Sequence, residues 1–215
     1  MNRDEKIAAL LNLRDEIRGC RLCSLREHYD SPVPFAGDPD APILLVGEAP
    51  GADEVVEGKP FVGKSGQLLR RAVERAGIVP ARDLMVGNTL FCRPPNNKFP
   101  TDSRIIGTCL PWIHSLIDIV RPRVIVAIGG KPHEYLRGSD EGITRAAGLV
   151  EDWTLELPGG DLTVRYIPTL HPSFCMRPGN PESNNSVMSL DIKGKKTLLL
   201  KHLMLAKRES NAYAR

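Results

Sequence analysis

Short runs of aliphatic and β-branched residues alternate along this chain with amphipathic segments of helical length. The runs that read as strands lie at residues 43–46, 84–90, 124–128 and 163–168, and the helical segments lie at 3–18, 67–76, 102–120 and 192–208. Such alternation is typical of a parallel sheet whose crossover connections are helices. The sequence therefore predicts an α/β fold, a three-layer α/β/α sandwich around a central, mostly parallel four-stranded sheet. Pro111 predicts a break or bend within the third helix.

Length and composition narrow the class of protein. A length of 215 residues suits one globular domain, and 41% hydrophobic with 26% charged residues is an ordinary globular composition. We therefore expect a single domain over residues 1–215, working as a monomer. No apolar run approaches the roughly 18 residues of a membrane span, and the first ten residues lack the apolar stretch of a secretory signal. These features predict a cytoplasmic protein without a membrane partner.

Loops that follow the predicted strands are the expected place of a ligand site, because ligands of open α/β sheets bind beyond the carboxyl ends of the strands. Three such loops stand out, at residues 47–66, 88–100 and 169–190. All three are rich in glycine, proline or polar residues, which is typical of segments outside regular structure. We expect the functional side chains to come from these loops.

Basic residues gather in two places, although the formal net charge is only +3. One group lies on the predicted helix 67–76 and its start, and the other lies on the closing helix. The members are Arg70, Arg71, Arg75, Lys193, Lys195, Lys196, Lys201, Lys207 and Arg208. Solvated helix faces and a phosphate-facing surface explain such groups equally well.

Four of the five cysteines are placed as the ligands of one metal centre. Cys20 and Cys23 lie on one tight turn after the first helix, a spacing found in zinc and iron–sulfur sites. Cys92 follows a predicted strand and Cys109 lies near the start of the next helix. Disulfides are rare in a reducing compartment, so these thiols are better interpreted as metal ligands. The spacing by itself does not separate zinc from a [4Fe–4S] cluster.

Other interpretations of these side chains are weaker. Cys92 and Cys109 could be small buried residues, since free cysteine is often found in cores. Cys175 has no partner at ligand spacing, and we expect an ordinary free thiol there. His28 could replace one ligand, but a solvated surface histidine is the simpler expectation.

The segment Gly58–Ser65 satisfies the written pattern of a Walker A phosphate loop. Its context contradicts that reading, because a Walker loop leaves directly from a strand and here the strand ends about ten residues earlier, near Gly47. The later strand 124–128 also runs into two glycines and not into the aspartate that binds magnesium. Nucleotide hydrolysis is therefore disfavoured.

Four segments, in order, carry a family resemblance: Gly47–Gly51, Pro60–Gly63 with Gly66, Asn88–Pro95 and His171–Ser173. Together with the interleaved cysteines they resemble the motifs of the family-four uracil-DNA glycosylases, which are bacterial and archaeal enzymes with a [4Fe–4S] cluster. The resemblance spans about residues 17–177 and implies the same fold. It implies hydrolysis of the N-glycosidic bond of deoxyuridine in single- or double-stranded DNA, leaving an abasic site. It also implies a [4Fe–4S] cluster on Cys20, Cys23, Cys92 and Cys109.

The resemblance assigns the base-recognition side chains. Phe61 is similar to the aromatic residue on which the flipped uracil stacks, and Asn88 to the asparagine whose amide pairs with N3–H and O4. His171 corresponds to the histidine that donates to O2 as negative charge develops on the leaving base. Without the motifs, Phe61 would be interpreted as a core aromatic, Asn88 as a loop-capping asparagine and His171 as a structural histidine.

The same resemblance assigns a second set of residues near the base. Glu48 resembles a glutamate that positions the base or the attacking water, and Ala49 stands where faster relatives carry a catalytic aspartate. Gly51 belongs to the same substrate-binding motif, and Glu54 aligns with an acidic residue near the base that could exclude the methyl group of thymine. The reaction is thus expected to depend on leaving-group stabilisation more than on a strong general base.

One segment departs from the family pattern. The family continues after the His171 motif with an aliphatic wedge and an arginine, whereas this chain has Phe174, Met176 and Arg177 and then a polar insertion through Ser189. Phe174 and Met176 could wedge into the base stack instead. The alternative is an iron–sulfur DNA-binding protein of the same fold that has lost excision. Residues 91–98 contain no histidine, so turnover is expected and not covalent trapping of DNA.

Overall fold

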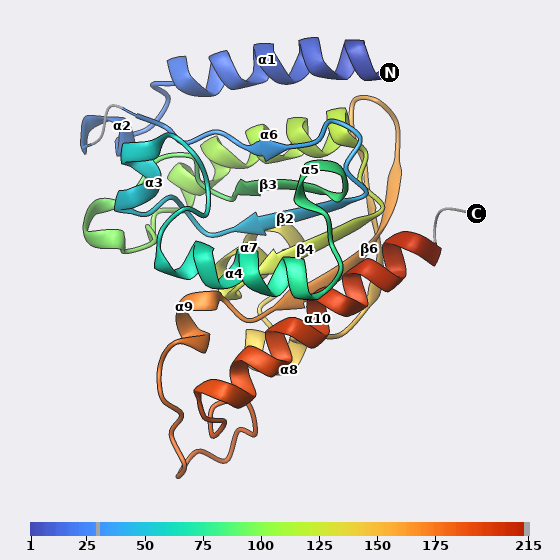
Figure 1. The fold of residues 1–215 in the computed structure, drawn as a ribbon. Coiled ribbons are helices and arrows are strands. Elements are labelled where there is room, and N and C mark those ends of the chain that lie inside the picture. Colours follow the sequence, from blue (N-terminus) through green and yellow to red (C-terminus); the bar gives the residue numbers. More distant parts are fainter. Residues whose placement is uncertain (29–30, 213–215) are drawn as a thin grey trace.

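The computed structural model describes residues 1–28 and 31–212, with the side chain of residue 28 left out. Six strands form one sheet in the order β1-β3-β2-β4-β6-β5 (Figure 1). The four inner strands run parallel, and the two edge strands are antiparallel to their neighbours. The strands are β1 (Ala36–Gly37), β2 (Ile43–Gly47), β3 (Leu84–Asn88), β4 (Val124–Ile128), β5 (Glu151–Leu155) and β6 (Leu162–Thr169).

The four predicted strands are confirmed as the parallel interior of the sheet, but the predicted strand number of four is wrong. Both additional strands are edges. β1 is two residues long, and β5 alternates buried with exposed residues and begins with two acids. Neither has an apolar run like Ile43–Val46 or Val124–Ile128, which is typical of a strand covered on both faces.

Helices cover both faces of the sheet, as the predicted three-layer sandwich requires. Alternate residues of each inner strand point to opposite faces, so that Leu44 packs with α1 (Arg3–Gly19) and α6 (Ser103–Val120). Its neighbour Leu45 packs with α4 (Lys64–Arg75) and α10 (Ile192–Ala212) on the other side. Figure 1 shows α1 and α6 above the sheet and α4 and α10 below it.

The remaining helices are short and lie in the connections. They are α2 (Leu25–His28), α3 (Ala52–Glu57), α5 (Pro80–Asp83), α7 (Gly130–Arg137), α8 (Ile143–Ala146), α9 (Pro172–Cys175) and the 3-10 turn η1 (Pro95–Asn97). No helix in the described ranges has both the length and the apolar character of a bilayer span.

Two helical predictions need correction. The loop expected over 47–66 contains helix α3, and α4 begins at Lys64 and not at residue 67, because Gly63 caps it in a glycine-rich stretch that hid the start. Of the break or bend expected at Pro111, the break is absent, because helix α6 continues through this residue. Pro111 is exposed, so its ring displaces no core side chain and the helix loses one backbone hydrogen bond.

The register of the parallel strands brings their carboxyl ends to one edge of the sheet. Gly47 at the end of β2 pairs with Asn88 at the end of β3, and Ile128 of β4 pairs with Thr169 of β6. The segments that follow these four residues therefore meet beyond a single edge, where α/β sheets bind ligands.

Candidate active site and metal centre

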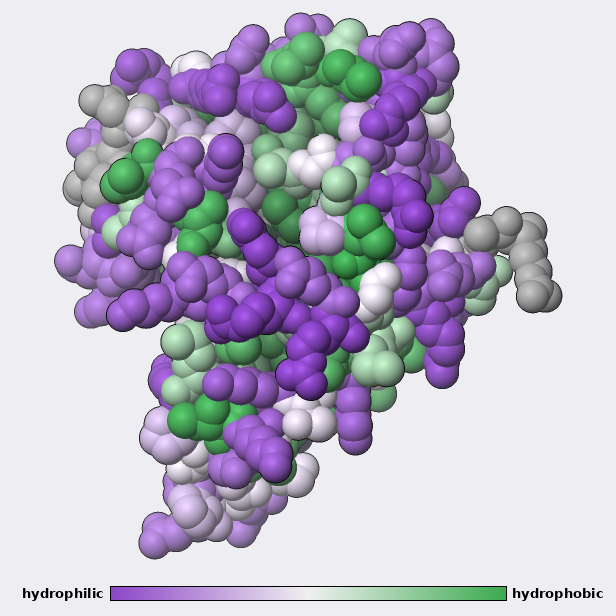
Figure 2. Space-filling model, viewed as in Figure 1, coloured by the Kyte–Doolittle hydropathy of each residue, from purple (hydrophilic) through white to green (hydrophobic). Residues whose placement is uncertain are grey.

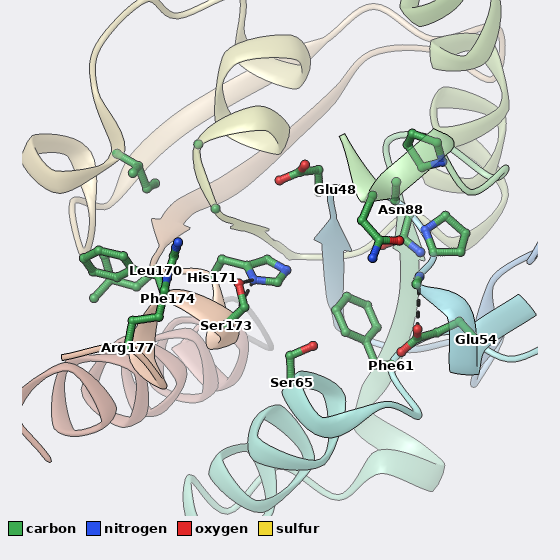
Figure 3. Close-up of a pocket in the computed structure, with 18 of the residues that line it drawn as sticks. Glu48, Glu54, Phe61, Ser65, Asn88, Leu170, His171, Ser173, Phe174 and Arg177 are labelled. Atoms are coloured by element: carbon green, nitrogen blue, oxygen red, sulfur yellow. Dashed lines mark hydrogen bonds between the residues drawn. The ribbon is translucent and has the colours of Figure 1, made fainter. Parts of the chain in front are cut away.

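A cavity of about 510 Å³ opens at this edge of the sheet. Residues from all three predicted loops line it, and Figure 3 shows Glu48, Phe61, Asn88 and His171 directed toward a common space. Ala49, Gly51 and Glu54 also line the cavity. The structure thus brings together every predicted catalytic and base-binding residue.

Asn88 and Phe61 are packed against a glycine. A Cβ atom on Gly47 would lie 2.4 Å from Oδ1 of Asn88 and 2.6 Å from Cζ of Phe61. Contacts this short do not occur, so only glycine at the end of β2 leaves room for both side chains. Asn88 is 3% exposed, and its position is fixed further because the backbone N–H of the next residue, Thr89, donates to the carbonyl of Gly47 at 2.8 Å.

Phe61 lies in a conformation that is unusual for a residue with a side chain. Its φ angle is 58°, in the left-handed region that costs a non-glycine residue about 1 kcal/mol or more. A Cβ on Gly66 would meet the backbone oxygen of Phe61 at 2.1 Å, so the loop presses directly on the first turn of α4. The surrounding loop must therefore hold this conformation.

The carboxylate of Glu54 provides that hold. Oε1 accepts hydrogen bonds from the backbone N–H groups of Val62 at 3.1 Å and Gly63 at 2.9 Å, and Oε2 accepts from Gly51 at 3.0 Å. The side chain is buried. Glu54 thus braces the two residues that follow Phe61 and the start of α3, a contribution that the sequence alone did not indicate.

His171 is the N-cap of α9, and its ring has a defined tautomer. Nδ1 accepts a hydrogen bond from the backbone N–H of Ser173 at 3.1 Å and lies 2.7 Å from its hydroxyl. A ring nitrogen that accepts from a backbone N–H carries no proton, so the proton of the neutral ring is on Nε2. Burial lowers the pKa of His171 to about 4, and the positive charge of Arg177 acts in the same direction. The imidazole is therefore neutral at pH 7 and offers one donor, Nε2–H.

Glu48 directly follows β2, and its side chain also faces the cavity (Figure 3). Burial raises the pKa of its carboxyl group, and the charge of Lys131 partly opposes this effect. Lys131 itself forms an ion pair with Glu134 at 2.8 Å. Glu48 is thus a desolvated carboxylate that no basic side chain neutralises by direct contact within residues 1–28 and 31–212.

Only two of the three predicted wedge residues lie at the cavity. Phe174 and Arg177 line the cavity, whereas Met176 is 41% exposed and does not line it. Arg177 lies over the ring of Phe174, with Cζ 5.6 Å from the ring centroid. The polar insertion also reaches the site, since Met188 lines the cavity and Asn185 donates to the hydroxyl of Thr144 at 3.0 Å.

The sequence places Lys195 among basic residues that are expected at the surface, and this expectation is wrong. The residue is 1% exposed, on the inner face of α10. Its ammonium group donates to the carbonyl oxygens of Arg177 at 3.3 Å and Pro178 at 3.1 Å, and it lies 4.2 Å from the ring centroid of Phe174. Lys195 therefore ties the segment after α9 to α10. Its role depends on packing between distant segments, which no local pattern reveals.

The Gly58–Ser65 segment does not form a phosphate loop. Helix α3 separates it from the end of β2, and β4 runs into Gly129. Both features agree with the expectation from the sequence. Ser65, in the first turn of α4, instead lines the cavity beside Phe61.

Cys20, Cys23, Cys92 and Cys109 line one small cavity between the end of α1 and the start of α6. Within the described residues all are free thiols, and Cys92 and Cys109 are buried. Burial raises the pKa of Cys92 to about 11 and that of Cys109 to about 12, and the neighbouring cysteines add to both shifts. Four buried or half-buried thiols at one place would repel one another as thiolates, so a cation is needed to hold them in that form.

Trp112 lines the same cavity and has a buried polar atom without a protein partner in the described part of the chain. The indole N–H of Trp112 is buried and finds no acceptor in the described part of the chain. In that same part, no three His, Cys, Asp or Glu side chains are arranged to hold a single metal ion. Four thiols that line one cavity are a donor set that fits a metal centre. The side chain of His28, the other possible ligand, lies outside the described residues.

Cys175 is a buried free thiol, as predicted, and its Sγ lies 3.6 Å from the carbonyl oxygen of Lys195. The cavity of the four cysteines shares no lining residue with the active-site cavity. The two are linked through the chain, because Cys92 lies four residues after Asn88 and Pro94 lines the active-site cavity. The cysteines therefore anchor one wall of the site without reaching into it.

Comparison with known proteins agrees with these features. Residues 34–188 match the family model of the Uracil DNA glycosylase superfamily. The Type-4 uracil-DNA glycosylase of Thermotoga maritima is 34% identical over 188 residues, which is 87% of this chain and 93% of that protein. That of Saccharolobus solfataricus is 33% identical over 168 residues, 76% of each chain. That of Archaeoglobus fulgidus is 40% identical over 158 residues, 74% of this chain and 78% of the relative.

Proposed function

Because this chain belongs to the uracil DNA glycosylase superfamily, we propose that it is a DNA repair hydrolase that excises uracil from DNA and leaves an abasic site. The observation that carries the proposal is the convergence of Phe61, Asn88 and His171 on one cavity large enough for a flipped base. A base must leave the stack before such an enzyme can reach its glycosidic bond. Single- and double-stranded DNA are both proposed as substrates.

Base recognition is assigned to Phe61 and Asn88. The ring of Phe61 offers a stacking face, and the amide of Asn88 offers one donor and one acceptor at a fixed place. Uracil presents an acceptor at O4 and a donor at N3, and cytosine presents the opposite pattern. An amide held in one orientation against Gly47 can therefore accept uracil and reject cytosine. The brace that Glu54 provides for the loop supports the placement of Phe61, and exclusion of the thymine methyl by Glu54 stays a prediction.

Stabilisation of the leaving base is assigned to His171. As the glycosidic bond breaks, negative charge develops on the base and positive charge on the sugar. The neutral ring of His171 has its proton on Nε2, and this donor would bind uracil O2 where the charge develops. With Ala49 in the place of a stronger base, this interaction supplies most of the catalysis.

Glu48 is assigned to orienting the attacking water. Its carboxylate faces the cavity and is desolvated, which raises its pKa and so strengthens it as a hydrogen-bond acceptor. The water adds its oxygen to the sugar carbon, and the departing base takes up a proton. The products are free uracil and an abasic site.

The four cysteines Cys20, Cys23, Cys92 and Cys109 are proposed to hold a [4Fe–4S] cluster. The shared cavity, the free thiols and the indole N–H of Trp112 support this assignment. When bound, the cluster supplies a rigid cross-link between α1, the segment after β3 and α6. Action as a cytoplasmic monomer stays a prediction.

The direct test is incubation of the purified holoprotein with an oligonucleotide that contains one uracil, followed by alkali to cleave abasic sites. Strand cleavage at the uracil, absent with thymine or cytosine at that position, is the expected result. Asn88→Ala and His171→Ala should each lower the rate strongly, and Gly107→Ala, in a helix away from the site, should not. DNA binding by a fully loaded protein without release of uracil would favour the non-catalytic alternative.

A further inference from the structure

A second depression of about 870 Å³ lies between α4 and α10, outside the active-site cavity. Its floor is apolar, and its rim carries four exposed cations. Arg71 and Arg75 come from α4, and Lys193 and Lys196 come from α10. Figure 2 shows strongly hydrophilic side chains gathered where these two helices run side by side. We call this depression the α4–α10 groove.

The cations of the α4–α10 groove form no ion pairs within the described residues. In the part of the chain that the structure describes, none of the four lies within ion-pair distance of a carboxylate. The single acid of the groove, Asp191, accepts a hydrogen bond from the backbone N–H of Gly194 at 2.6 Å, at the start of α10. Four cations against one carboxylate give the groove a net positive charge.

Basic residues farther along α10 differ in this respect. Lys207 pairs with Asp83 at 2.7 Å, and Arg208 pairs with Glu209 at 2.9 Å. In the described part of the chain, Lys193 and Lys196 in the groove and Lys201 outside it form no ion pair, so the ion-paired cations of α10 lie toward its carboxyl end. Of the basic residues that the sequence groups together, Lys207 and Arg208 form ion pairs, and four others line the groove. Arg70 and Lys201 lie outside the groove, and Lys195 is buried.

The α4–α10 groove adjoins the active-site cavity at two places. Ser65 lines the cavity, and Leu68, one turn later on α4, lines the groove. Arg177 lines the cavity, and the next residue, Pro178, lines the groove. A chain that leaves the cavity across the first turn of α4 would therefore enter the groove directly.

We propose that the α4–α10 groove binds the sugar-phosphate backbone of the DNA strand that carries the uracil, to one side of the flipped nucleotide. This inference rests on the proposed function. Arg71 and Arg75 lie one helical turn apart, about 6 Å along the axis, and Lys193 and Lys196 lie about one turn apart on the facing helix. Two facing rows of cations suit an extended polyanion, since a compact anion would reach only part of them. The apolar floor between the rows suits the sugars, which carry no charge.

The test uses pairs of variants that match in charge. Arg71→Ala/Lys196→Ala removes one groove cation from each helix, and Arg70→Ala/Lys201→Ala removes one exposed cation from each helix outside the groove. Binding of each protein to a uracil-free single strand is measured by fluorescence anisotropy over a range of salt concentrations. The Arg71→Ala/Lys196→Ala variant should bind several-fold more weakly at low salt. Its negative slope of log K against log salt should become shallower by about 1.4, at about 0.7 for each lost phosphate contact. The control pair should keep the slope of the unaltered protein.

A second measurement locates the contact. Two oligonucleotides carry the uracil near one end, with the additional nucleotides on the 5′ side in one and on the 3′ side in the other. The groove pair should lose affinity for only one of them, and its single-turnover excision rate at saturating protein should match that of the unaltered protein. An equal slope for both pairs, or equal losses on both oligonucleotides, would overturn the inference. Failure of the unaltered protein to excise uracil would instead remove the proposed function, because binding and excision are measured separately.

Discussion

The backbone N–H of Ser173 donates to Nδ1 of His171 at 3.1 Å, and this contact fixes the proton of the neutral ring on Nε2. Loss of the Nε2–H donor of His171 should therefore lower the excision rate more than loss of the Ser173 side chain. We expect His171→Ala to lower the single-turnover excision rate by about 10²–10³, as loss of one oxyanion donor does elsewhere. Ser173→Ala should have a smaller effect, because the backbone N–H remains when the hydroxyl is lost. An equal loss in both variants would contradict the conclusion that the backbone N–H of Ser173 is sufficient to orient the ring.

The pH dependence of excision tests the same ring in a different way. Burial lowers the pKa of His171 to about 4, so the imidazole stays neutral as the pH falls from 8 to 5. A histidine with an ordinary pKa near 6.5 would take up a proton within that range. The single-turnover rate should therefore show no inflection between pH 6 and 7. An inflection there that disappears in His171→Gln would show that the ring titrates normally.

Gly47 offers a test of the base-recognition geometry that leaves the recognition residues themselves in place. A Cβ at this position would lie 2.4 Å from Oδ1 of Asn88 and 2.6 Å from Cζ of Phe61, so Gly47→Ala must displace one or both. We expect a marked loss of excision and weaker discrimination against cytosine. Gly107→Ala is the matched control, because a Cβ there meets nothing within 4 Å and alanine favours a helix interior. If Gly47→Ala excises uracil normally, Asn88 and Phe61 do not bind the base as assigned.

The interior of the fold could be predicted from sequence because it depends on local signals. A strand buried on both faces, such as Val124–Ile128, must be apolar throughout, and that run is visible in the sequence. The edges gave no such signal, since β1 is two residues long and β5 begins with Glu151 and Asp152. Edge strands are defined by their neighbours in the sheet, which are distant in sequence.

The candidate site also contains residues that could be predicted from the sequence and residues that could not. Phe61, Asn88 and His171 lie in motifs that resemble a known family, so their positions could be predicted although their contacts could not. Lys195 could not be recognised, because a lysine on a basic helix gives no sign that its ammonium group is buried against two carbonyl groups of another segment. The brace formed by Glu54 also depends on how α3 folds back over its own loop.

Lys195 is expected to matter most where the DNA must be opened. Lys195→Met keeps the length and apolar stem of the side chain but removes the donor to the carbonyl oxygens of Arg177 and Pro178. The segment that carries Phe174 should then be less firmly held, so excision from double-stranded DNA should fall more than excision from a single strand. Lys201→Met, an exposed site on the same helix, is the control. Equal losses on both substrates would indicate a general loss of stability instead.

The cysteine centre can be tested by its metal content. Cys109→Ser should lose the visible absorbance of an iron–sulfur cluster and lower the melting temperature, because ligand binding and folding are coupled. Cys175→Ser should keep both, since that thiol is buried elsewhere. About four iron atoms per chain are expected in the unaltered protein. One zinc ion and no iron would refute the cluster.

Trp112 tests the environment of the proposed cluster and not its ligands. Trp112 lines the cavity of the four cysteines, and its buried indole N–H has no acceptor in the described residues. A buried donor without a partner costs about 1–3 kcal/mol, so a sulfur acceptor from the cluster would remove that cost. Hydrogen bonds to cluster sulfurs make reduction easier, because they stabilise the added negative charge. Trp112→Phe should therefore keep the iron content but lower the reduction potential measured by voltammetry. Trp153→Phe, away from the cysteines, should leave the potential unchanged. An unchanged potential in Trp112→Phe would mean that its N–H does not reach the cluster.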